Sequence, residues 1–349
     1  MRDEHVVAFL SRYMKQTRKT GLVVLYNHNY ENNIDLIFNL YRPNFSTIRQ
    51  LMPFYRGDRE GVISVFGNSF VFQTYIAQAR RELQQMPCDD ILIIGDDLLL
   101  NPELDEFNIH EKLNITPGAF YIDKVENICS GEFSRPLDEA DKFSCTPPGL
   151  DQSANRWVPS YDEAFTILRS KGLIDSCRLR KYKPFYPLFR SPLLGGGNAY
   201  KNYRIFKARV YHFLKMLRYR IKPTTFAYPC VFGYSDLILI PKEKLDLFCR
   251  YLETFATWGM FVEMAIPTAM MLMPDTQVCH ADNHRYRTGN VWYPFDPKHY
   301  ERINSTIDKL FHACNGDISR LPEEYPREYL YLHPVKLSRF KAKSTNSAR

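Results

Sequence analysis

The chain of 349 residues has no apolar run approaching the roughly 18–20 residues that a membrane-spanning helix needs. Its start, Met1-Arg2-Asp3-Glu4, is not typical of a signal peptide. The eight cysteines are scattered and include no C-x-x-C pair, which argues against a zinc framework and against a dense disulfide scaffold. We therefore expect a cytoplasmic protein whose thiols are reduced.

Apolar and aromatic residues, by contrast, are plentiful, at 45% and 14% of the chain. This is enough to bury a sizeable core in one large α/β domain or in two modest ones. The formal net charge of +7 favours partners that carry phosphate, or an anionic surface.

The most informative stretch is residues 89–102. Four consecutive apolar residues, 91–94, predict a strand that is buried on both faces. Gly95 follows, and then Asp96 and Asp97. Ligands of open α/β sheets bind outside the carboxyl ends of strands. Two adjacent carboxylates there repel each other unless hydrogen bonds or a hard divalent cation compensate. The alternative is that one aspartate caps the next helix and the other is solvated.

This acidic pair, with residues 98–102 continuing as they do here, resembles the metal-binding DXD-type motif of the GT-A glycosyltransferases. In that family the pair holds Mn²⁺ or Mg²⁺ against the diphosphate of a nucleotide-sugar. The resemblance implies that Asp96 and Asp97 are metal ligands and that Asp96 also contacts the nucleotide. It further implies a GT-A, Rossmann-like α/β fold. Such a fold has a mixed, mostly parallel sheet flanked by helices, here with a helical, loop-rich insertion.

A second resemblance lies near the end of the chain. GT-A enzymes of the glycogenin and lipopolysaccharide galactosyltransferase type have a late His that completes the metal shell. A Lys a few residues further on contacts the diphosphate. His333 and Lys336 are similar to that pair, but the usual intervening Gly and the Pro-Trp after the Lys are absent, and Pro334 is inserted. The resemblance implies that His333 is a metal ligand and that Lys336 binds diphosphate. A structural histidine is the alternative in so apolar a segment.

The first predicted strand, residues 21–26, leads into a polar loop at its carboxyl end. Tyr26 and Tyr30 are candidates to stack on a nucleotide base, and Asn27 is a candidate to hydrogen-bond it. The alternative, to which we give equal weight, is that Tyr26 belongs to the core and that Asn27 only turns the chain. Arg56, which follows a second apolar segment, is a further candidate cation for the nucleotide.

Two carboxylates are candidates for the base that an inverting transferase needs to deprotonate its acceptor. Glu263 lies alone in the apolar run 258–270, and Asp236 lies near the start of the predicted strand 232–241. We favour Glu263, because apolar surroundings raise the pKa of a carboxyl. The alternatives are a pairing of Glu263 with an arginine or a backbone amide, and a strand-edge cap for Asp236. A retaining enzyme needs no such base, and the sequence does not decide between the two.

The segment 201–222 has eight basic residues and no acidic one, with apolar residues at helical spacing. It predicts a basic amphipathic helix, whose apolar stripe either faces the core or contacts an anionic lipid surface or nucleic acid.

The expected organisation of the chain is a basic amphipathic helix (1–20), a nucleotide-sugar-binding half (21–130), a loop-rich insertion (131–200), an acceptor-binding half (201–338) and a flexible basic tail (339–349).

Together these features predict a metal-dependent glycosyltransferase of glycan or polysaccharide biosynthesis. It would use a nucleoside-diphosphate sugar, with UDP-sugars favoured, and a glycan or lipid-linked acceptor, and would work in the cytoplasm or peripherally on the inner face of a membrane. A nucleotidyltransferase of similar fold is the alternative enzyme, but residues 27–30 lack the Gly-rich, basic loop expected there. A basic module for nucleic acid or anionic membrane leaves the acidic pair unexplained, and we expect no nucleic-acid partner. An inactive scaffold that only binds a sugar nucleotide is a further alternative.

Overall fold

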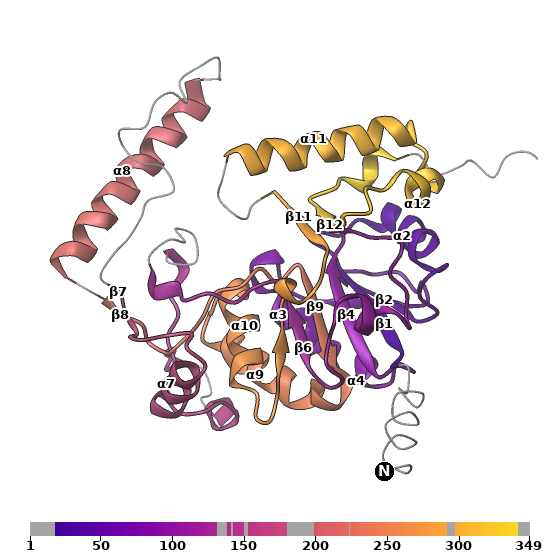
Figure 1. The fold of residues 1–349 in the computed structure, drawn as a ribbon. Coiled ribbons are helices and arrows are strands. Elements are labelled where there is room, and N and C mark those ends of the chain that lie inside the picture. The colour runs from indigo at the N-terminus through magenta and orange to yellow at the C-terminus, as the bar shows by residue number, and fades with distance from the viewer. Residues whose placement is uncertain are drawn as a thin grey trace, which may run out of the picture.

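A seven-stranded sheet forms the centre of the molecule, in the order β10-β6-β9-β4-β1-β2-β3 (Figure 1). This computed structural model describes residues 18–130, 138–140, 142–149, 153–179, 199–222, 224–291 and 297–340. The strands of the sheet are β1 (Thr20–Leu25), β2 (Ile48–Pro53), β3 (Val62–Val65), β4 (Asp90–Gly95), β6 (Phe120–Ile122), β9 (Leu237–Pro241) and β10 (Val278–Cys279). Strand β9 runs antiparallel to β4 and β6, and the other neighbouring pairs are parallel. The predicted α/β fold with a mixed, mostly parallel sheet is confirmed.

Helices cover both faces of this sheet, so its central strands are buried on both sides. In β4, Ile91 and Ile93 belong to one core cluster, and Leu92 and Ile94 belong to the other. The first cluster contains residues of α3 (Phe72–Gln78), α4 (Arg80–Gln84), α7 (Tyr161–Ser170), α9 (Leu245–Thr257) and α10 (Val262–Leu272). The second contains residues of α2 (Ile34–Tyr41), α5 (Ile109–Lys112), α11 (Pro297–Cys314) and α12 (Leu321–Glu324). Strand β4 is a continuous apolar run because both of its faces are buried, as the sequence predicted.

A second, three-stranded sheet joins the end of the chain to the acidic loop. It contains β5 (Leu99–Leu100), β11 (Arg287–Asn290) and β12 (Tyr329–His333), in the order β11-β12-β5. Strand β12 pairs antiparallel with β5, with Leu332 opposite Leu99. Just beyond the pairing, the backbone N–H of Val335 donates to the carbonyl oxygen of Asp97 at 2.6 Å. This small sheet is what brings the late histidine beside the acidic pair.

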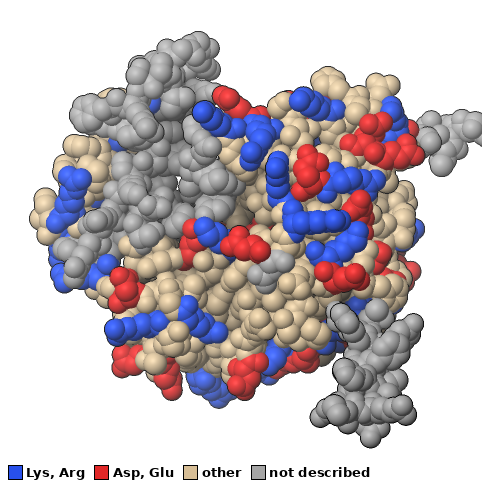
Figure 2. All heavy atoms as spheres, viewed as in Figure 1, with Lys and Arg blue, Asp and Glu red and all other residues tan. Residues whose placement is uncertain are grey.

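One long helix and two short strands lie outside the two sheets. Helix α8 (Ala199–Ile221) confirms the predicted basic helix, and a short ladder of β7 (Arg178–Leu179) with β8 (Thr224–Thr225) adjoins it in the fold. On the face seen in Figure 2, basic and acidic side chains are intermingled around α2 and α11, so the net positive charge is not gathered there. The predicted helix within residues 1–20 lies, up to residue 17, outside the described residues, as do residues 131–137, 180–198 and the tail from 341.

A buried ion network at the start of β4 ties this strand to its surroundings. The Asp90 carboxylate accepts a hydrogen bond from Nε of Arg18 at 2.6 Å and lies 2.8 Å from Nε2 of His110. Burial acts to raise the pKa of Asp90, but the hydrogen bonds from His110 and Arg18 outweigh it and hold the pKa below its ordinary value. The ionised carboxylate is therefore the form that stabilises the fold.

Replacing this carboxylate is expected to destabilise the protein. Asp90→Ala removes the buried carboxylate that Arg18 and His110 contact, while Arg18 keeps its contact with Glu243, and we expect a cost of about 3 kcal/mol. Urea unfolding at neutral pH measures the loss. The control is Asp308→Ala, which removes an exposed ion pair with Arg339 and is expected to cost under about 1 kcal/mol. Equal losses in the two variants would contradict the structural role of Asp90.

Candidate active site

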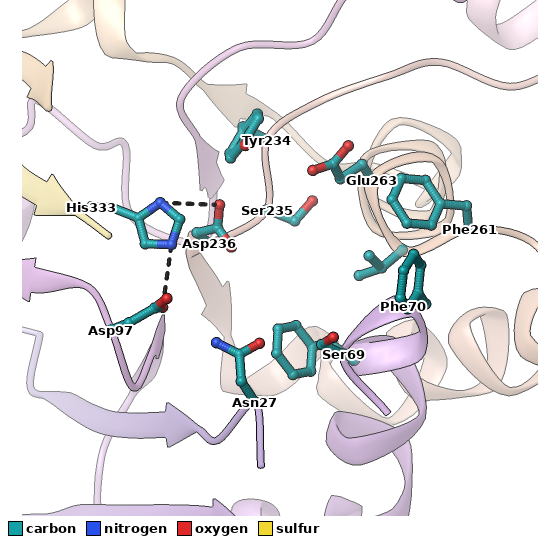
Figure 3. Close-up of a pocket in the computed structure, with 12 residues that line it drawn as sticks. Asn27, Ser69, Phe70, Asp97, Tyr234, Ser235, Asp236, Phe261, Glu263 and His333 are labelled. Carbon is teal, nitrogen blue, oxygen red and sulfur yellow. Dashed lines mark ion pairs between the residues drawn. The ribbon is translucent and has the colours of Figure 1, made fainter. Parts of the chain in front are cut away.

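A cavity of about 200 Å³ lies at the edge of the large sheet where β1 and β4 end. Its lining consists of Asn27, Ser69, Phe70, Phe72, Asp97, Tyr234, Ser235, Asp236, Phe261, Val262, Glu263 and His333 (Figure 3). Asn27 follows β1 and Asp97 follows β4, and these strands are parallel. Asp236 precedes β9, whose antiparallel direction brings its amino end to the same edge. The topology thus gathers polar side chains from distant parts of the sequence at one place.

His333 lies between two carboxylates at this edge. Its Nε2 is 3.2 Å from Oδ1 of Asp97, and its Nδ1 is 3.9 Å from Oδ2 of Asp236 (Figure 3). The side chain of His333 is only 7% exposed, whereas that of Asp97 is 31% exposed and borders the cavity. Burial acts to lower the pKa of His333, but the carboxylates of Asp236 and Asp97 outweigh it and raise the pKa to about 9. The imidazole is therefore protonated at neutral pH.

Asp96, the first residue of the acidic pair, turns away from this cluster. Its Oδ1 accepts hydrogen bonds from the backbone N–H of Asn27 at 3.1 Å and from the Asn27 side-chain amide at 3.2 Å. Burial and the neighbouring charge of Asp97 raise the pKa of Asp96 to about 7. In this structure Asp96 fixes the loop after β1 against the loop after β4, and it is Asp97 that faces the cavity.

The two candidate bases approach the cavity from different elements. Asp236 lies beside His333, and burial raises the pKa of its carboxyl while the His333 charge opposes that shift. Glu263 lies in the first turn of α10, and its backbone carbonyl accepts a hydrogen bond from Gly233 at 2.9 Å. In Figure 3 the Glu263 carboxylate faces the cavity from the wall opposite Asp97, near Phe261. Both carboxylates selected from the sequence therefore border the cavity that Asp97 and His333 border.

The other predicted nucleotide contacts lie elsewhere. Tyr26 is fully buried and its hydroxyl donates to Gln50, which agrees with the alternative that Tyr26 belongs to the core. A side chain in that position has no face open to a base. Tyr30, Arg56 and Lys336 are exposed, and none of the three is among the described residues that line the cavity.

Several lining residues escaped the sequence analysis. Ser69 and Phe70 come from the short helix Ser69–Val71, which follows β3, and the Phe70 ring lies 6.1 Å from the Phe261 ring. Ser69 and Phe70 could have been predicted, because the loops that follow parallel strands lie at one edge of a sheet. Tyr234 and Ser235 directly precede Asp236, but nothing in their residue types marks them as parts of a site.

The Asp97–His333 pair has the donor types and spacing of two neighbouring metal ligands. Among the described residues, no group of three or more His, Cys, Asp or Glu side chains is arranged to hold a metal ion. Mg²⁺-type sites, however, commonly use one or two protein ligands and take the rest from water and substrate phosphates. Two ligand atoms at right angles on one octahedral ion are about 3 Å apart, and Oδ1 of Asp97 and Nε2 of His333 are 3.2 Å apart. The buried Nδ1 of His333 also finds no hydrogen-bond partner among the described residues. The residues present therefore fit such an ion.

Comparison with known proteins adds little to this geometry. No protein-family model matches the chain, and no curated protein matches it. A similar solved structure is 2-C-methyl-D-erythritol 4-phosphate cytidylyltransferase from Thermus thermophilus. It shares 14% sequence identity, the match covers 44% of this chain and 78% of that one, and the TM-score is 0.19. At that TM-score the likeness carries no argument about this chain. The α/β class defined above rests on the strand order and register described for this protein.

Proposed function

We propose that the chain is a metal-dependent glycosyltransferase. It would move a sugar from a nucleoside-diphosphate sugar, with UDP-sugars favoured, to a glycan or lipid-linked acceptor. The observation that carries the proposal is the meeting of Asp97 and His333 at the end of β4, beside a cavity that Asn27 and Glu263 also line. Carboxylate and imidazole donors at the carboxyl ends of parallel strands suit a divalent ion with a diphosphate bound to it.

Each residue of the cluster has a distinct part in this proposal. Asp97 and His333 would hold Mn²⁺ or Mg²⁺. Asp236, next to Nδ1 of His333, would keep the ring proton on that nitrogen and so turn the Nε2 lone pair toward Asp97. Asp96 would hold Asn27 in place as part of the nucleotide pocket. When bound, the ion would act as a Lewis acid that neutralises the charge developing on the departing diphosphate.

Glu263 is the proposed base for an inverting transfer. Asp236 is placed against His333 and is better suited to orienting the imidazole, whereas Glu263 faces the cavity from the opposite wall. A carboxylate there would take the proton of the attacking acceptor hydroxyl. Tyr30, which is exposed in the same loop as Asn27, is the candidate to stack on the base. Arg56 and Lys336 are exposed outside the cavity lining, and their contacts with the nucleotide and its diphosphate stay predictions.

Nucleotide binding separates this proposal from the nucleotidyltransferase alternative. Calorimetry with UDP, GDP and CMP, each with and without Mn²⁺, is expected to find at least one nucleotide that binds only when Mn²⁺ is present. The same nucleotide carrying a sugar should then be consumed in the presence of an acceptor. A nucleotidyltransferase would instead release pyrophosphate from a nucleoside triphosphate and a sugar phosphate, and that result would contradict the proposal.

Metal affinity is expected to depend steeply on pH. Because the His333 pKa is raised to about 9, the metal-free imidazole is protonated at pH 7 and must lose a proton before Nε2 can bind an ion. The apparent Mn²⁺ affinity should therefore rise by up to about tenfold per pH unit between pH 6 and about 9, with one proton released. Calorimetry in two buffers of different ionisation enthalpy measures that proton.

The histidine variants test this assignment directly. His333→Gln should bind Mn²⁺ weakly and release no such proton, whereas His312→Gln, a change of an exposed histidine on α11, should behave as the wild type. Proton release that is the same in His333→Gln and in the wild type would contradict the role of His333.

A further inference from the structure

Among its described side chains, helix α8 buries those that lie on one face. It runs for 23 residues, about 35 Å of rise, and extends away from the large sheet (Figure 1). His212, Lys215 and Tyr219 are buried and recur at intervals of three and four residues, so they share a face. Nζ of Lys215 lies 2.8 Å from Oδ1 of Asp138. This face fixes which side of the helix turns outward.

The outward side carries the apolar stripe. Its described members sit three, four and seven residues apart and comprise Tyr203, Phe206, Val210, Leu214, Leu217 and Ile221. At about 100° per residue these positions point roughly opposite to the buried face. Phe206 is 61% exposed and Ile221 is 84% exposed. Of the alternatives that the sequence left open, the core-facing stripe is not the one found, because the core-facing positions of α8 belong to the other side. A row of large apolar side chains in water indicates a contact surface.

Cations flank this stripe on both sides. By the same helical geometry, Lys207 and Arg218 lie along one edge, and Arg220 lies along the other. The segment 201–222 contains no acidic residue that would offset them. Arginine and lysine beside an apolar stripe are the pattern of helices that lie in a membrane interface, where the apolar side enters the acyl boundary and the cations meet phosphate headgroups.

We propose that α8 docks the protein on the surface of an anionic lipid bilayer, with the helix axis in the plane of the interface. This inference is independent of the proposed transferase activity. Nucleic acid would use the cations and leave the apolar stripe in water, whereas a purely apolar protein groove would leave the flanking cations unused. None of the helices in the described parts of the chain is both long and apolar enough to cross a membrane.

Vesicle binding of the full chain tests the apolar part of the proposal. The wild type is expected to sediment with vesicles of phosphatidylglycerol and phosphatidylcholine and to bind pure phosphatidylcholine much more weakly. Phe206→Glu is expected to lower partitioning at least about tenfold, because it removes a large ring that the bilayer would bury. The matched control is Phe107→Glu, which alters a phenylalanine that is 52% exposed elsewhere on the molecule and should bind as the wild type does.

A second pair of variants tests the charges at equal net charge. Lys207→Glu with Arg218→Glu is expected to weaken binding about 30-fold or more, since each basic residue near an anionic surface contributes a factor of about five. Lys171→Glu with Lys309→Glu changes the net charge of the protein equally, at exposed positions outside α8, and should bind nearly as the wild type. Thermal unfolding confirms that each variant is folded.

Three outcomes would overturn the proposal. One is equal vesicle binding by Phe206→Glu and Phe107→Glu. Another is binding that is indifferent to the anionic lipid. The third is self-association in the absence of lipid that only Phe206→Glu abolishes, since the stripe would then be an interface between two copies of the chain.

Discussion

Asp97→Asn is expected to lower metal-dependent sugar transfer by about 10³-fold or more while the protein remains folded. Asparagine keeps the size of the side chain but removes the charge that faces the cavity beside His333. Loss of one anionic ligand weakens the ion and the stabilisation that it gives the departing diphosphate, which is several kcal/mol of the barrier. Turnover of the nucleotide-sugar over a range of Mn²⁺ concentrations measures the loss.

The control for this variant is its neighbour. Asp96→Asn keeps an oxygen that accepts the Asn27 hydrogen bonds, and the raised pKa of Asp96 shows that burial already disfavours its charge. It should retain activity within about tenfold of the wild type, because the hydrogen bonds from Asn27 are weakened by the lost charge and not removed. Full activity in Asp97→Asn would contradict the metal assignment. Equal losses in both variants would contradict the separate roles of the two aspartates.

Glu263→Gln is expected to lower transfer by about 10²- to 10⁴-fold, the usual contribution of a general base. Mn²⁺ and nucleotide binding should be nearly unchanged, because Glu263 lies across the cavity from Asp97 and His333. The rate of the residual reaction should also lose its dependence on the ionisation of a carboxyl at low pH. Steady-state rates with a saturating donor and a varied acceptor, measured across pH, give all three results.

Two further variants distinguish the loss of a general base at Glu263 from other effects on the rate. Glu253→Gln, on the exposed side of α9, should leave the rate unchanged. Asp236→Asn should weaken Mn²⁺ binding, because Asp236 orients His333, and so differs from Glu263→Gln in what it impairs. If Glu263→Gln keeps the full rate and the product retains the anomeric configuration of the donor, the base assignment is wrong.

Much of the sheet could be predicted from the sequence because burial leaves a compositional trace. The four apolar residues of β4 are divided between two cores, and that environment selects a continuous apolar run rather than an alternating one. The position and antiparallel direction of β9 could not be predicted in this way, because an antiparallel strand buried on both faces has the same composition as a parallel one. The division of the chain into a donor half and an acceptor half stays a prediction.

The arrangement of the site depends on the pairing of two strands that are far apart in the sequence, and no local pattern predicts that pairing. Strand β5 has two residues, too short for any periodicity, yet its pairing with β12 brings His333 to Asp97. A resemblance in motif order was the only indication of that contact. Asp96 and Asp97 look equivalent in sequence, and only the fold shows that one turns to Asn27 and the other to the cavity.

The orientation of helix α8 could not be predicted from the sequence either. Helical spacing predicts which residues share a face, but it does not predict where that face points. Tyr219 and His212 decide the orientation by being buried, and neither residue stood out in the sequence. As a result the apolar stripe, which resembles a core-facing one in sequence, is exposed to solvent.

The most direct test of the central claim is a crystal structure of the protein with Mn²⁺ and UDP, with the anomalous scattering of manganese used to locate the ion. We expect one strong peak within bonding distance of both the Asp97 carboxylate and Nε2 of His333, and also in contact with the diphosphate. Manganese bound elsewhere, or UDP seated without an ion at Asp97, would contradict the account.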